Sequence, residues 1–188
     1  AEDSQESMEP YGFSEYQDWG DVEGGPMDGA LKDPKIADEA VDWLAKRAPE
    51  VAAAKPWFMT VNFVNPHDVM YFDTDAEEMV QVKGLFPIFG EPDVPLYHQK
   101  WQTILPASYF DDLEAQPAAV RSYKRLCDLY YGRIPKDRRD MWHNHVNYYL
   151  NCILDVDRHI GAVLDALDAS GQADDTIVIF TADHGEQG

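Results

Sequence analysis

Two residues near the end of the sequence, Asp183 and His184, place a carboxylate and an imidazole directly after a run of β-prone residues, 176–181. Such a run predicts a strand with both side chains at its carboxyl end, and Gly185 lets the backbone turn sharply after them. Oxygen and neutral nitrogen ligands suit Ca²⁺, Mg²⁺, Mn²⁺ or Zn²⁺, and two ligands do not choose among these ions. The alternative is a capped turn in which Asp183 accepts hydrogen bonds from backbone N–H groups.

A second polar cluster contains His67, which stands in the sequence Asn65-Pro66-His67-Asp68 after an aromatic and β-branched run, 57–64. An imidazole titrates in the range that general acid or base catalysis needs, although a single histidine can also serve as a structural hydrogen-bonding group. Ligands of open α/β sheets bind beyond the carboxyl ends of the strands. If both strands run parallel, His67 faces the same crevice as Asp183 and His184.

The elements that would position these residues are two strands and three helices. The run 57–64 is apolar enough for a strand buried on both faces of a parallel sheet, and the run 176–181 is predicted to be a strand that completes an αβ unit with the helix before it. Helical patterns predict helices over 34–48, 118–131 and 138–170, the first with Asp33 as its cap and Pro34 at its first position. Gly171 supplies the stop of the longest helix. The predicted fold is therefore α/β, with a largely parallel sheet flanked by helices.

The rest of the chain does not show a sustained period. Residues 1–31 are acidic and contain several glycines and scattered aromatic residues. This composition predicts an extended segment whose aromatic side chains pack against the rest of the protein. Residues 69–117 are rich in proline and aromatic side chains, which predicts a long loop excursion. That loop either forms a pocket wall over the strand ends or is only tethered by its aromatics.

Composition limits the possible partners. A formal net charge of -20 argues against nucleic acid or an anionic membrane surface, and an anionic ligand would need a bound cation or a few placed Lys and Arg. No apolar run is long enough for a membrane span. Cys127 and Cys152 lack the spacing of a metal motif, so we expect small buried apolar side chains at both positions.

Three sequence blocks, in their order and spacing, carry a resemblance to a known family. They are Lys55-Pro56-Trp57-Phe58 leading to Asn65-Pro66-His67-Asp68, then Tyr148-Tyr149 with Asp157 and Gly161, and last Asp174-Asp175-Thr176 leading to Asp183-His184-Gly185-Glu186. The chain resembles the middle of a type I, arylsulfatase-like sulfatase of the alkaline-phosphatase-like superfamily. The resemblance implies that residues 1–188 are part of a sulfatase catalytic domain with the alkaline-phosphatase-like sandwich fold.

By this resemblance, Asp183 and His184 are metal ligands, with calcium the usual metal and manganese or magnesium used in some branches. His67 is the histidine that contacts the sulfate and helps the leaving-group oxygen to depart, and Asp157 and Gly161 are structural. The substrate is a small-molecule or saccharide sulfate ester. A periplasmic or secreted location is favoured.

The same resemblance implies that part of the machinery lies outside this chain. The family's nucleophile is a formylglycine made from a Cys or Ser in a Cys/Ser-x-Pro/Ala-x-Arg motif, which neither Cys127 nor Cys152 fits. An acidic pair and a lysine of the family are also missing, so we expect an internal fragment that is inactive alone. A phosphonate or phosphate ester hydrolase of the same superfamily and a non-catalytic metal-binding relative are the alternatives.

Overall fold

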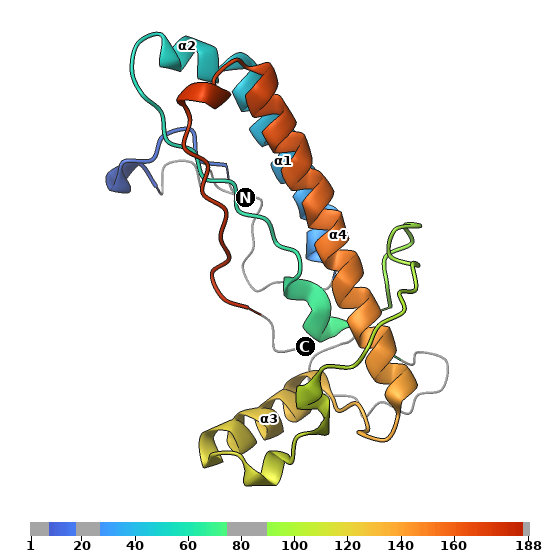
Figure 1. Cartoon of the computed structure of the whole chain (residues 1–188). Helices are drawn as coiled ribbons and strands as arrows, with labels where there is room; N and C mark the ends of the chain where they lie inside the picture. Colours follow the sequence, from blue (N-terminus) through green and yellow to red (C-terminus); the bar gives the residue numbers. More distant parts are fainter. Residues whose placement is uncertain (1–7, 18–26, 75–89, 186–188) are drawn as a thin grey trace.

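A computed structural model describes residues 8–17, 27–74 and 90–185, and in this part the chain is mainly helical. Its main helices are α1 (Asp28–Lys46), α2 (Ala48–Ala52), α3 (Ala118–Tyr131) and α4 (Arg139–Ala169). The long helix α4 packs along α1, and α3 projects near the opposite end of α4 from α2 (Figure 1). Short 3-10 helices lie between them, including η3 (His67–Tyr71), which contacts both α1 and α4.

The predicted sheet is wrong for the described residues. Both predicted strands, 57–64 and 176–181, have an extended backbone, and neither forms a strand in the part of the chain that the structure describes. Phe58 is 75% exposed and Ile177 is 90% exposed, so these runs are not buried on both faces. β-Branched and aromatic residues favour a strand only where a neighbouring strand offers backbone partners, and that pairing is not encoded in the run itself.

Helix α1 begins six residues earlier than the pattern at Asp33-Pro34 predicts. Its first turn is stabilised by an ion pair of 2.9 Å between Lys32 Nζ and Asp28 Oδ2, and Pro34 lies inside the helix. Asp33 is fully buried and accepts hydrogen bonds from a distant segment, so it does not cap α1. The signal was misread because a capping residue and a buried polar anchor have the same side chain.

Helices α3 and α4 confirm their predicted bounds to within one residue, and Gly171 ends the second with φ of 72°. The buried face of α4, however, is only partly apolar. Two apolar residues of this helix, Ile153 and Leu164, are exposed. The residues that are buried include three polar ones; they are Met141, Asn147, Tyr148, Asn151, Cys152, Asp155 and Leu167.

Two apolar clusters hold the helices together. One joins Leu44 of α1 and Ala48 of α2 to Leu167 of α4. The other is made of Val69, Phe72, Tyr97, Tyr148 and Cys152. Within it Phe72 stacks on Tyr148 with ring centroids 4.2 Å apart. The buried position of Cys152 is confirmed, whereas Cys127 is half-buried, and neither forms a disulfide bond with another described residue.

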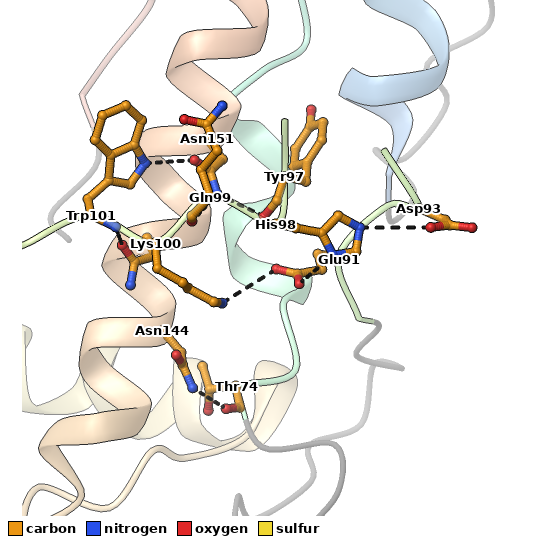
Figure 2. A network of polar contacts seen from close by, with 11 residues as sticks. Thr74, Glu91, Asp93, Tyr97, His98, Gln99, Lys100, Trp101, Asn144 and Asn151 are labelled. Atoms are coloured by element: carbon orange, nitrogen blue, oxygen red, sulfur yellow. Dashed lines mark hydrogen bonds and ion pairs between the residues drawn. The ribbon is translucent and has the colours of Figure 1, made fainter. Parts of the chain in front are cut away.

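The long loop is tethered to α4 by polar contacts as well as by its aromatics (Figure 2). Asn151, fully buried, donates from Nδ2 to the carbonyl oxygens of Tyr97 (2.8 Å) and Gln99 (3.0 Å). Its Oδ1 accepts from the indole N–H of Trp101 at 2.7 Å. Of the two expectations for this loop, these contacts favour the tether for residues 97–101.

The acidic N-terminal segment is described only over residues 8–17, and residues 28–31 belong to α1 instead. Phe13 contacts Phe58 with ring centroids 6.0 Å apart. Glu15 accepts hydrogen bonds from Arg47 (2.9 Å) and from the indole of Trp43 (2.6 Å), and these bonds lower the pKa of the Glu15 carboxyl. The pinning of this segment is therefore partly aromatic, as predicted, and partly ionic. No helix among the described residues is long and apolar enough to cross a membrane.

Replacing Asn151 by Ala removes three hydrogen bonds and leaves two backbone carbonyl groups and one indole N–H without these partners. We expect the free energy of unfolding of the full-length protein to fall by about 2–4 kcal/mol. Backbone amides of residues 97–103 should also exchange faster in hydrogen-exchange mass spectrometry. Asn62→Ala, the same change at an exposed side chain, is the control. Equal stability of the two variants would contradict the structural role of Asn151.

Candidate functional site

His67 is the first residue of η3 and its side chain is exposed. The His67 backbone N–H donates to the Val64 carbonyl at 3.0 Å, and Val69 N–H donates to the Pro66 carbonyl at 3.1 Å, so a compact turn presents the imidazole. The peptide bond between Asn65 and Pro66 is cis. The His67 ring lies 6.3 Å from the ring of Tyr71. The imidazole is thus reachable from outside while its backbone is held by hydrogen bonds.

The turn that carries His67 is fixed from α1 by Asp33. The buried Asp33 carboxylate accepts from the backbone N–H groups of Val64 (2.7 Å) and Asn65 (3.1 Å). The contact is close, because a Cβ added at Gly29 would lie 2.3 Å from Asn65 Oδ1. Only glycine leaves room there for the Asn65 side chain to pass α1.

The same turn is fixed from α4 by Asp155, which is 1% exposed. Asp155 Oδ2 accepts from the Tyr97 hydroxyl at 2.7 Å and from Asn65 Nδ2 at 3.3 Å, and Asn65 Nδ2 also donates to the Tyr97 hydroxyl oxygen at 3.0 Å. Asp155 Oδ1 accepts from Arg158 Nε at 2.7 Å. These hydrogen bonds join α4, the long loop and the His67 turn at one buried carboxylate.

Burial around Asp155 also governs the titration of its neighbours. Desolvation and then the hydrogen bond to Asp155 raise the pKa of the Tyr97 hydroxyl well above its usual range, so Tyr97 keeps its proton and donates a hydrogen bond to Asp155 at all physiological pH values. Desolvation lowers the pKa of the His159 imidazole, whose Nε2 lies 3.7 Å from Asp155 Oδ1. Asp157, expected to be structural, is exposed, and Asp155 is the residue of this block that ties α4 to its neighbours.

The structure places Asp183 and His184 in a bend at the end of the extended run, with side chains 87% and 79% exposed. Asp183 Oδ1 accepts from the His184 backbone N–H at 2.8 Å, which is the bond of a capped turn. Asp183 Oδ2 lies 3.5 Å from His184 Nε2. His67 is far from both in the sequence and lies at the start of η3, which contacts α1 and α4.

The Asp183 and His184 donors suit one shared cation. Oxygen and nitrogen ligands bind divalent ions at about 2.0–2.5 Å, so two donors 3.5 Å apart can reach a common point between them. The described residues contain no group of three or more His, Cys, Asp or Glu placed around one ion. Two donors are therefore what this part of the chain can contribute to a metal site.

The buried anchors Asp33, Asn65 and Asp155 were missed by sequence reasoning. A signal for part of them was present, because Asn147, Asn151 and Asp155 recur every four residues and so share one face of a helix. A polar stripe in that arrangement is usually taken for a solvated surface. Its burial here follows from donors and acceptors in segments far away along the chain.

Replacing Asp155 by Asn removes the charge that Arg158 pairs with and places an amide where Tyr97 and Asn65 need an acceptor. We expect the free energy of unfolding of the full-length protein to fall by about 2–4 kcal/mol, measured by chemical denaturation. The control is Asp157→Asn, the same change two residues further along α4 at an exposed side chain. The proposed anchor is wrong if the two variants are equally stable.

Comparison with known proteins decides which family the chain comes from. The model of one family, described as Sulfatase, matches residues 3–188. The chain belongs to the sulfatase family. This match confirms the resemblance carried by the three sequence blocks. No solved structure matches the chain.

Curated relatives of this sulfatase chain are distant. It is 26% identical over 167 residues to iduronate 2-sulfatase of Mus musculus, covering 84% of this chain and 26% of the relative. It is 25% identical to iduronate 2-sulfatase of Homo sapiens with the same coverage. It is 29% identical over 140 residues to the multifunctional alkaline phosphatase superfamily protein PehA of Trinickia caryophylli, covering 71% of this chain and 24% of the relative. The chain thus spans about a quarter of the length of these relatives.

Proposed function

We propose that the full-length protein containing this chain hydrolyses sulfate esters, with His67 as a catalytic residue and Asp183 and His184 as ligands of a divalent cation. The observation that carries the proposal is the His67 turn. It combines an exposed imidazole with a backbone held from α1 by Asp33 and from α4 through Asn65. A proton-transfer group needs access to the substrate and a fixed position, and this turn supplies both. The sulfatase family match gives the class of ester.

In this proposal the chain's residues have separate roles. Asp183 and His184 would hold the cation, with calcium the first choice and manganese or magnesium as alternatives. The bound cation would neutralise charge on the sulfate oxygens. Protonated His67 donates its proton to the ester oxygen as the sulfur–oxygen bond breaks, so that the alcohol leaves neutral. The nucleophile, a formylglycine in this proposal, lies outside this chain.

His67→Ala in the full-length protein tests the catalytic role. Loss of a proton donor to the leaving group should lower kcat about 100-fold or more for a sulfate ester with a poorly acidic alcohol. The loss should be smaller for a nitrophenyl sulfate, whose leaving group needs less help. His98→Ala, a histidine of the loop docked on α4, is the control (Figure 2). Unchanged turnover in His67→Ala would contradict the role and favour a non-catalytic relative.

Asp183→Asn tests the metal role independently of turnover. Loss of the charged ligand should weaken calcium binding to the full-length protein about tenfold or more, measured by isothermal titration calorimetry after chelation and dialysis. Asp175→Asn, an exposed carboxylate in the 3-10 helix η6 (Ala173–Asp175), is the matched control. Equal calcium affinity of the two variants would mean that Asp183 only caps the turn and is not a metal ligand.

A phosphonate or phosphate ester hydrolase is the second candidate, because the chain is 29% identical to PehA, an alkaline phosphatase superfamily protein. The same His67 and metal donors could serve either ester, since both reactions build negative charge on peripheral oxygens. Rates of the full-length protein on matched aryl sulfate, phosphate and phosphonate esters separate the candidates. The ester with the highest kcat/KM identifies the reaction.

A further inference from the structure

The positive charge of this acidic chain is concentrated in one segment. Residues 121–139 hold seven of the 15 Lys and Arg, against two acidic residues, whereas the chain as a whole has a net charge of -20. We call residues 121–139 the basic segment. Anions approaching the rest of the chain meet a repulsive field, so this segment is where an anionic group gains most.

The basic segment contacts the turn that carries His67. Tyr131, at the end of α3, meets Tyr71 edge-on with ring centroids 5.8 Å apart. Tyr71 in turn lies 6.3 Å from the His67 ring. Two residues beyond Tyr131, Arg133 is in an isolated β-bridge, as is Phe72 immediately after η3. Tyr131, two residues before Arg133, is thus linked to the proposed catalytic histidine through two aromatic contacts.

Most cations of the basic segment are already engaged. The ion pairs are Lys124 with Asp128 and Arg138 with Asp140, at 2.8 and 2.6 Å. Backbone carbonyls accept from Arg121 and Lys136, and Arg139 lies over the ring of Phe110. Among the described residues, the side chains of Arg125 and Arg133 make no ion pair or hydrogen bond, and both are exposed. Of these two arginines, Arg133 is the nearer in sequence to Tyr131, which contacts the His67 turn through Tyr71.

We propose that Arg133 binds a second negatively charged group of the substrate, a carboxylate or a further sulfate, in addition to the ester sulfate that is hydrolysed. The inference rests on the proposed function and names its substrate class, a sulfate ester with two anionic groups. A guanidinium pairs with a carboxylate or a sulfate through two parallel N–H···O bonds. A free guanidinium on the segment that contacts the His67 turn therefore favours a substrate with an anionic substituent near the reacting ester.

Arg133→Gln in the full-length protein tests this assignment. Two aryl sulfates are compared, one with a carboxylate substituent and one with the neutral carboxamide in its place. We expect kcat/KM to fall about tenfold or more for the carboxylate ester, mainly through KM, because a charge-assisted pair is lost. For the carboxamide ester we expect a change of less than about twofold.

Lys46→Gln is the control, because it removes the same charge from an exposed side chain at the C-terminal end of α1 (Figure 1). Arg133 is not a substrate-binding residue if its variant slows both esters equally or neither. An equal selective loss in Lys46→Gln would assign the effect to net charge and overturn the proposal. If the unaltered protein hydrolyses neither ester, the proposed function fails and this inference fails with it. If Arg133→Gln hydrolyses both esters with the same ratio of kcat/KM as the unaltered protein, this inference is wrong and the proposed function stands.

Discussion

The buried carboxylate of Asp155 is the constraint on which the centre of this structure depends. A charge withdrawn from water costs several kcal/mol unless hydrogen-bond donors surround it, so the donor groups around Asp155 are held in their positions. Asp155 finds those donors in Arg158 of its own helix, Tyr97 of the long loop and Asn65 of the His67 turn. Three segments far apart in sequence are thereby brought to one point.

The hydrogen bonds around Asp155 and the two apolar clusters hold the helices together in different ways. At the α2 end the helices are held by Leu44, Ala48 and Leu167, contacts that tolerate small shifts because dispersion and burial are not directional. In the middle of α4 the apolar cluster around Tyr148 and Cys152 is joined by hydrogen bonds to Asn151 and Asp155, which lose strength within a few tenths of an ångström or about 30°. The part of the molecule fixed by directional bonds is the part that presents His67. This distribution suits a site in which a histidine must be positioned and the helix ends need only remain associated.

What could be predicted from the sequence follows from how local each interaction is. Helices α3 and α4 were found within one residue of their bounds because helical hydrogen bonds and the stop at Gly171 are set by neighbours along the chain. The sheet could not be predicted, because strand pairing depends on residues that a run such as 176–181 does not contain. The adjacency of Asp183 and His184 follows from their sequence positions. The anchoring of the His67 turn by Asp33 and Asp155 spans 32 and 90 residues and has no local signature.

Charge gives the last constraint on how such a chain handles an anionic ligand. At physiological ionic strength the screening length is about 8 Å, so most of the acidic surface acts weakly on a group already bound and mainly slows its approach. Binding is then decided by charges within contact distance, where a guanidinium or a metal ion acts almost unscreened. A free Arg133 in this acidic molecule therefore stabilises a bound anion more than the net charge of -20 suggests. The acidic surface repels every anion on approach. An anion without a second anionic group gains no attraction from Arg133 to offset this repulsion, so the acidic surface raises selectivity for ligands that carry one.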